Sequence, residues 1–274
     1  MGIPVAIIAF FIAVGITGIS LGSEDPVLWS IPSDVWVYGS IILWGWWQIS
    51  RHRISLARLV GRIPKGFPWH SILGLVGLQI LFSLATFFLI FIPISYALPE
   101  FVQEILQVPF FLSEAETSFP GLYNGWLIFV IVIVAPVVEE LLFRGIIFSR
   151  WANKWGAKRA IIFSSLLFGV LHVEGTLGAF VFGVVMALLY LRTRTLLIPI
   201  ACHMLNNAVA VALGIWDFGV GDLSSLEDFR SMLWFAVIGL AIATPILFLY
   251  IRRAWGTLAN GLPYFDTVTV PATE

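Results

Sequence analysis

The chain has 274 residues, of which 59 % are hydrophobic and only 11 % are charged, with a mean hydropathy of +0.97. A soluble domain carries about a quarter charged residues, so this composition cannot cover a surface in water and excludes a soluble globular enzyme or a disordered chain. Fifteen Lys and Arg against 16 Asp and Glu leave no basic excess, which excludes a nucleic-acid binder. One cysteine excludes a disulfide framework and a cysteine-based zinc site. The composition predicts a multi-pass membrane protein.

Eight apolar segments have the length and composition of membrane-spanning helices. They predict an all-α polytopic helical bundle, a single integral membrane domain over residues 1–274 with a tail at 254–274. The first segment has no basic stretch before it, so we interpret it as an anchor and not as a cleaved signal peptide. The fifth and sixth are short, and we expect a hairpin whose tip stops short of the far surface. The predicted spans are 3–21, 35–50, 71–97, 126–148, 160–172, 176–191, 196–215 and 232–251.

Charge assigns the two sides of the membrane. With all eight spans in place, 13 of the 15 basic residues fall in loops on one side, and the acidic loops fall on the other. By the positive-inside rule, both termini are then cytoplasmic and the protein lies in the cell membrane. The segment 51–66 mixes apolar and basic residues; it is either an amphipathic segment on the anionic leaflet or an ordinary charged loop.

A few ionisable and amide side chains remain inside the predicted spans. A charged side chain at the centre of a spanning helix costs about 2.5–3.5 kcal/mol on insertion scales, so such residues usually mark function. The alternative is structural: a buried ion cluster that fixes helix register, an interfacial histidine, and amides that bond between helices. The residues are Glu139, Glu140 and Arg144 in the fourth span, His172 at the end of the fifth, and His203, Asn206 and Asn207 in the seventh.

Helical spacing divides these residues by role. Glu140 and Arg144 are four apart and can pair along one face, whereas Glu139 points about 100° away and stays free to take a proton. His203 and Asn207 are also four apart and share a face. Counted from the cytoplasmic ends, Glu139, His172 and His203 lie roughly 16, 18 and 12 Å deep. Three helices therefore bring them to similar depth, and we expect them to meet in one cavity.

A carboxylate and an imidazole around a water molecule can hydrolyse an amide by general-base catalysis. A second imidazole and an Asn carboxamide are suitable donors to a developing oxyanion. Cys202 adjoins His203 but points about 100° away, which disfavours a Cys–His pair. Ser164 and Ser165 are better explained as helix-packing residues.

Three short motifs carry a family resemblance. Glu139-Glu140-Leu-Leu-Phe-Arg144 fits EExxxR, Phe168-Gly-Val-Leu-His172 fits FxxxH, and His203-Met-Leu-Asn206-Asn207 fits HxxxN. Their order and membrane setting resemble the CPBP family, which includes the CAAX proteases of the Ras-converting type and bacterial abortive-infection and bacteriocin-processing proteins. The resemblance covers about 126–210, within a motif-bearing core at about 126–215.

The resemblance implies a glutamate-dependent intramembrane endopeptidase with an eight-helix core and no cofactor or metal. Carried over by position, it implies that Glu139 activates water with His172, that His203 and Asn207 form the oxyanion hole, and that Glu140 and Arg144 support the site. The implied partner is a membrane-associated protein or peptide in the lipid bilayer, of which a prenylated CAAX-type substrate is one kind. The depths fit a substrate tail that enters from the cytoplasmic leaflet.

Three alternatives stay open at this point. The same protease can be zinc-dependent, with Glu139, His172 and His203 as ligands, although no HExxH motif is present. A non-catalytic immunity or regulatory protein can hold a partner helix in the cavity. A proton-coupled transporter also uses acidic and His residues in helices, but the sequence shows no inverted repeat.

Overall fold

The computed structural model describes residues 25–51, 55–107, 110–215, 225–256 and 258, and every regular element in these ranges is helical. This confirms the predicted all-α class. The first predicted span, residues 3–21, lies outside the described residues, as do His52 and the tail from residue 259 onward.

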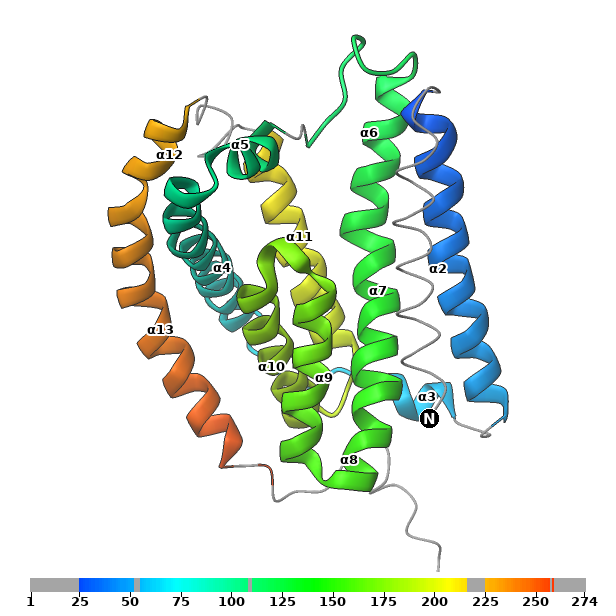
Figure 1. Cartoon of the computed structure of the whole chain (residues 1–274). Coiled ribbons are helices and arrows are strands. Elements are labelled where there is room, and N and C mark those ends of the chain that lie inside the picture. The colour runs from blue at the N-terminus through cyan, green and yellow to red at the C-terminus, as the bar shows by residue number, and fades with distance from the viewer. Residues whose placement is uncertain (1–24, 52–54, 108–109, 216–224, 257, 259–274) are drawn as a thin grey trace, which may run out of the picture.

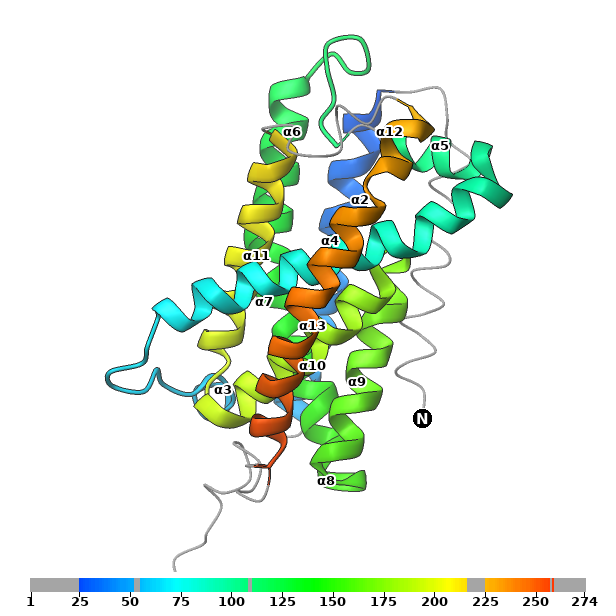
Figure 2. The ribbon, with the colours of Figure 1, turned by 90° about the vertical axis from the view of Figure 1, so that its left-hand side faces the viewer.

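Six described helical segments are long and apolar enough to cross a membrane, and Figures 1 and 2 show them in one bundle. The multi-pass helical bundle is therefore confirmed. The number eight is not, because α9 (Ala157–Leu171) has only 15 residues and the first span is not described. The six are α2 (Pro26–Arg51), α4 (His70–Ala97), the long helix Pro120–Trp155, α10 (Thr176–Thr193), α11 (Leu197–Ile215) and the segment Leu226–Trp255, which holds α12 (Leu226–Ser231) and α13 (Leu233–Trp255).

The long helix extends past the predicted span 126–148 at both ends. Two of its stretches are π-helical, and they flank the paired glutamates. Such turns are rare and frequently lie at functional sites. In chain order the helix consists of α6 (Pro120–Phe129), the π-helix η1 (Val130–Val134), α7 (Ala135–Glu140), the π-helix η2 (Leu141–Phe148) and α8 (Ser149–Trp155).

The predicted hairpin is formed by α9 and α10, joined by the 3₁₀ turn η3 (Val173–Gly175). The two helices approach closely because small residues lie between them: a Cβ built on Gly183 would lie 2.9 Å from Ser165 Cβ. Figure 1 shows the hairpin turn about half-way along the bundle, while α4 and α6 continue well beyond it.

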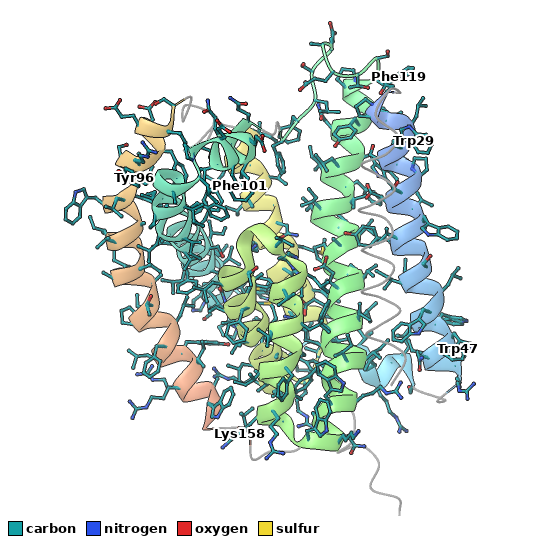
Figure 3. The ribbon with its side chains drawn as sticks, viewed as in Figure 1. Trp29, Trp47, Tyr96, Phe101, Phe119 and Lys158 are labelled. Atoms are coloured by element: carbon teal, nitrogen blue, oxygen red, sulfur yellow. The ribbon has the colours of Figure 1, made fainter. Side chains whose placement is uncertain are left out.

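Basic and acidic side chains separate to opposite ends of the bundle, here named the basic end and the acidic end. Lys158 lies at the basic end, where α9 begins, and Glu100 and Glu227 begin α5 (Pro99–Gln107) and α12 at the acidic end. Exposed aromatic side chains gather near both ends, as expected for membrane interfaces. Figure 3 labels Trp47 toward the basic end and Trp29, Tyr96, Phe101 and Phe119 toward the acidic end.

The described part of the predicted amphipathic segment 51–66 has both exposed and buried apolar side chains, with Leu56 and Ile63 each 42 % exposed. It contains one short helix, α3 (Leu56–Val60), whose Leu59 is only 2 % exposed within the hydrophobic core. The Val60 carbonyl accepts hydrogen bonds from the Leu196 N–H and the Thr195 hydroxyl, each at 2.8 Å. Leu59 and Val60 therefore attach α3 to the protein at the basic end, while the amphipathic interpretation of the segment stays a prediction.

Arg230, the basic residue that falls on the acidic side, has a structural explanation. Its Nε donates to Ser95 Oγ at 2.9 Å and its Nη2 donates to the Ser95 carbonyl at 2.6 Å. The guanidinium also lies 4.1 Å from the centre of the Tyr96 ring. Arg230 thus ties α12 to the end of α4.

Asp25 ties the start of α2 to the segment before α6. Its carboxylate accepts hydrogen bonds from the Thr117 hydroxyl, the Ser118 N–H and the Val27 N–H. The bonds from Thr117 and Ser118 hold the pKa of Asp25 below its ordinary value. Further along, Trp126 Nε1 donates to Asp34 Oδ2 at 3.0 Å, so α2 is joined to α6 as well.

The lowered pKa of Asp25 sets the direction of a pH effect. A carboxylate with a lowered folded-state pKa contributes stability above its unfolded pKa of about 3.9, and this contribution is lost as the pH falls through the folded value. We expect the unfolding temperature of Asp25→Asn to fall less than that of the wild type between about pH 5 and pH 3. Thermal unfolding followed by tryptophan fluorescence measures this, and equal falls in both proteins would contradict it.

Candidate active site

The centre of the site is a buried ion pair within the long helix. Arg144 Nη1 donates to Glu140 Oε1 at 2.7 Å, and the two residues are 2 % and 0 % exposed. Arg144 Nη2 donates to the Gly183 carbonyl of α10 at 3.1 Å. The structure thus shows the Glu140–Arg144 pairing that the spacing predicts, and adds a bond from that pair to the hairpin.

His203 of α11 lies between the two glutamates. Its Nδ1 lies 3.0 Å from Glu140 Oε1, and its Nε2 lies 4.0 Å from Glu139 Oε2. Because an ionised carboxylate only accepts hydrogen bonds, Nδ1 carries a proton and donates to Glu140. This orients the imidazole with Nε2 toward Glu139. The side chain of Glu139 is 19 % exposed, and its Oε2 accepts no hydrogen bond within the described residues.

Phe168 of α9 connects the motifs. The Arg144 guanidinium lies 4.9 Å from the centre of its ring, a distance suited to a cation–π contact. The rings of His172 and His203 lie 4.3 and 6.1 Å from it, centre to centre. One buried phenyl ring therefore touches residues of all three motifs, a role that its position one turn before His172 did not reveal.

His172 is oriented by its own helix. Its Nδ1 lies 2.8 Å from the Phe168 carbonyl, which can only accept, so Nδ1 carries the proton and Nε2 is left with a free lone pair. The residue ends α9 and is exposed, and neither a hydrogen bond nor an ion pair joins it to Glu139. The two side chains can therefore act together only through an intervening molecule.

Asn207 is held by a backbone irregularity in the long helix. In the π-helix η1, the Ala135 N–H bonds to the carbonyl five residues earlier, that of Val130. The next bond of this kind would join the N–H of residue 136 to the Ile131 carbonyl. Pro136 has no N–H. The Ile131 carbonyl instead accepts from Asn207 Nδ2 at 2.9 Å, while Asn207 Oδ1 accepts from Asn206 at 3.3 Å. Asn206 thus positions its neighbour.

His172, His203, Asn206 and Asn207 border an open cavity of about 550 Å³, whereas Glu139, Glu140 and Arg144 are not among its lining residues. Its wall is formed by α4, the hairpin turn and α11, and it carries both imidazoles and both amides. Cys202 lies in the core and Ser165 packs against Gly183, in agreement with their predicted non-catalytic roles. The principal lining residues are Ser83, His172, Val173, Phe182, His203 and Asn207.

Gly183 is a site residue that the sequence analysis missed, because no motif contains it. Its carbonyl holds Arg144, and an added Cβ would meet Ser165 Cβ at 2.9 Å and Cα at 3.0 Å. We expect Gly183→Ala to destabilise the protein by about 1–3 kcal/mol through overpacking, and to lower activity by displacing Arg144. Unfolding temperature and peptide hydrolysis measure the two effects.

The matched control is Gly77→Ala in α4, where an added Cβ meets nothing within 4 Å. This variant should be neutral or slightly stabilised, because Ala is the better helix former. Adding Ser165→Gly to Gly183→Ala should restore part of the lost stability. A Gly183→Ala protein that unfolds like Gly77→Ala would contradict the assigned close approach.

Fold and site together define a multi-pass helical membrane protein with a buried carboxylate–imidazole–guanidinium cluster beside an open cavity. Residues 121–209 match the model of a family described as "Type II CAAX prenyl endopeptidase Rce1-like". The segment holds all the candidate site residues, and the match confirms the family predicted from the three motifs over these residues.

Two curated relatives match the same part of the chain. "Putative membrane peptidase YdiL" of Bacillus subtilis is 35 % identical over 89 residues, which are 32 % of this chain and 36 % of that protein. "Membrane-embedded CAAX protease MroQ" of Staphylococcus aureus is 35 % identical over 92 residues, 31 % of this chain and 37 % of that protein. The chain thus matches little more than a third of each relative's length. No solved structure matches significantly.

Proposed function

We propose that this protein is an intramembrane endopeptidase that hydrolyses a peptide bond of a membrane-associated substrate with water activated by Glu139. The observation that carries the proposal is that His203 lies 4.0 Å from Glu139 and borders, together with His172, an open cavity in a membrane bundle. The names of the family and of both relatives support a membrane protease.

Water activation is assigned to Glu139 and His172. Glu139 Oε2 accepts no described hydrogen bond, and His172 Nε2 has a free lone pair because its Nδ1 donates to the Phe168 carbonyl. A water molecule between them can give one proton to the carboxylate and direct its other hydrogen to the imidazole. Its oxygen then attacks the peptide carbonyl, and Glu139 passes the proton to the leaving amine.

His203 is assigned to stabilise the oxyanion. Nδ1 of His203 lies 3.0 Å from Glu140 Oε1, which fixes the ring, and Nε2 is directed toward Glu139. A hydrogen on Nε2 is the donor that this role requires. A fixed donor of this kind contributes about 2.7–4 kcal/mol to the transition state in other enzymes.

Asn207 and Arg144 complete the assignment. Asn207 Nδ2 has two hydrogens, and its bond to the Ile131 carbonyl uses one. The other can donate to the oxyanion beside His203. Glu140 and Arg144 do not face the reacting atoms in this scheme; they are positioning residues that orient His203 and fix α10 through the Gly183 carbonyl.

The partner is a membrane-associated protein or peptide, including prenylated CAAX-type substrates, and not a nucleic acid. We place the protein in the cell membrane with the basic end in the cytoplasm, by the positive-inside rule. This puts the end of α13 on the cytoplasmic side and the start of α2 on the opposite side. The predicted span 3–21, which would return the N-terminus to the cytoplasm, lies outside the described residues.

The test is reconstitution of the purified full chain with lipidated and unlipidated C-terminal peptides, with cleavage located by mass spectrometry. Cleavage of either peptide supports the proposal, and a preference for the lipidated peptide assigns the prenylated class. If a broad peptide panel is left uncut while Glu139 is intact, the immunity or regulatory interpretation replaces the protease.

The zinc-dependent alternative receives no support from the donor geometry. Within the described ranges, no three His, Cys, Asp or Glu side chains are arranged to hold a metal ion. We expect activity to survive chelation, as measured by hydrolysis after EDTA treatment with full metal analysis. Activity that is lost and then restored by zinc would contradict the glutamate mechanism.

A further inference from the structure

A second cavity lies in the basic half of the bundle. It has a volume of about 670 Å³ and is bordered by the loop before α4, the first turns of α4, the end of α10 and the second half of α13. Figure 2 shows the loop between α3 and α4 at the edge of the bundle. This cavity shares no lining residue with the one beside His172 and His203, and the proposed function gives it no role.

The walls of the second cavity are apolar and reach the outside of the bundle. Ile72 and Leu75 of α4 form a buried part of the wall, whereas Ile246 of α13 is 46 % exposed. Ile246 lies in a segment that is long and apolar enough to cross a membrane, so its exposed side faces acyl chains. Gly74 also lines the cavity, and a Cβ added there would meet nothing within 4 Å. A hydrocarbon chain can therefore occupy the cavity without leaving the bilayer.

The charged groups of this cavity are both cationic. Lys65 of the loop and Arg192 in the last turn of α10 line it, and Arg192 Cζ lies 5.8 Å from the centre of the Tyr250 ring. Within the described residues, neither cation has an ion-pair partner, and the Tyr250 hydroxyl makes no hydrogen bond of normal geometry. No Asp or Glu lines the cavity. Its polar groups therefore suit an anion with hydrogen-bond acceptors.

We propose that this cavity binds an anionic phospholipid, whose phosphate lies between Lys65 and Arg192 and whose acyl chain lies along Leu75 and Ile246. Basic cavities between spanning helices on the cytoplasmic side are typical sites for anionic headgroups. A peptide is a poorer occupant, because apolar walls leave its backbone groups without hydrogen-bond partners. The positive-inside rule places the basic end, and with it the lipid, on the cytoplasmic side.

The lipid joins two helices that also build the candidate active site. α4 carries Ser83, which lines the other cavity, and α10 carries Gly183, whose carbonyl accepts from Arg144. A phospholipid held between the start of α4 and the end of α10 therefore stabilises this part of the bundle. Since a ligand that binds only the folded protein raises the unfolding temperature, binding can be measured without any turnover. The proposal does not depend on the protease activity.

Native mass spectrometry of the delipidated full chain in a neutral detergent tests the proposal. The probes are dioleoyl phosphatidylglycerol and dioleoyl phosphatidylcholine, which have the same chains and differ in headgroup charge. We expect the wild type to retain the anionic lipid preferentially, and to gain unfolding temperature mainly with that lipid. Equal retention of the two lipids by the wild type would overturn the proposal.

Lys65→Gln combined with Arg192→Gln should weaken binding of the anionic lipid by about 30-fold, the usual contribution of two basic side chains near an anionic lipid surface. Both side chains are exposed, so the fold should survive their replacement. The matched control is Lys158→Gln combined with Arg253→Gln, which removes the same charges from exposed positions outside this cavity. The control should retain the wild-type preference. An equal loss in both double variants would contradict the proposal, because binding would then follow net charge alone.

A change of shape tests the acyl-chain site separately. Gly74→Phe fills the cavity without altering its charge and should also weaken binding, whereas Gly77→Phe in the same helix points into open space outside the cavity and should not. Identical binding by these two variants would place the acyl chain elsewhere and overturn the proposal. Glycerol 3-phosphate, which has the phosphate but no chain, should leave the unfolding temperature unchanged at the lipid's concentration. Protection equal to that of the lipid would show a site for soluble phosphates instead.

Discussion

Glu139→Gln is expected to lower peptide hydrolysis by at least 10²–10⁴-fold, the usual contribution of a general base, while the protein stays folded. Glutamine is nearly isosteric with glutamate but cannot accept the proton of the attacking water. Among the residues that the structure describes, the ion-pair partner of Glu139 is His203 at 4.0 Å, a long contact, so little stability is lost. Initial rates of cleavage and the unfolding temperature measure the two effects.

The matched control is Glu104→Gln, which makes the same chemical change on the exposed surface of α5 and should leave the rate unchanged. His172→Gln is expected to lower the rate as well, because it removes the imidazole lone pair. A Glu139→Gln protein that cleaves peptides at the wild-type rate would contradict the proposed mechanism. A cellular phenotype that survives this change would favour the non-catalytic binding protein.

The sequence was sufficient for the fold class and for the pairs that lie within one helix. Helical spacing alone predicts the Glu140–Arg144 pair, and the apolar runs predict most helices to within a few residues. The convergence of Glu139 and His203 was predicted from their similar depth, because depth along each spanning helix is measured on the same axis, the membrane normal. The structure places those two side chains 4.0 Å apart.

Contacts between helices could not be predicted in the same way. Spacing fixes which face a residue occupies, but not which neighbouring helix that face meets. The contact of Phe168 with Arg144 and the bond from Arg144 to the Gly183 carbonyl depend on how α9 and α10 pack against the long helix. The bond from Asn207 to Ile131 depends on a π-helical register that Pro136 accompanies. No pattern in the amino-acid sequence signalled that register.

The attachment of α3 could not be predicted for the same reason. Leu59 of α3 and Leu196 before α11 belong to one core cluster. Their separation in the sequence hides this contact.

Arg144→Met is expected to cause the largest loss of stability of any single change in the site. Glu140 is 0 % exposed and its Oε2 has no hydrogen-bond partner among the described residues, so Arg144 is its main compensating charge. Removal of one partner from a buried ion pair costs about 3–5 kcal/mol in other proteins. The variant also loses the bond to Gly183, so α10 is held less firmly. Unfolding temperature in detergent measures the change.

A double variant separates charge from packing. Glu140→Gln combined with Arg144→Met removes both charges and leaves side chains of similar size, so it should be more stable than Arg144→Met alone. The bond from His203 Nδ1 can then be made to the glutamine oxygen, which preserves the ring orientation. If the double variant is instead less stable than either single variant, the cluster is held by shape and not by its charge balance. In that case, Glu140 and Arg144 do not support His203 as a charge pair.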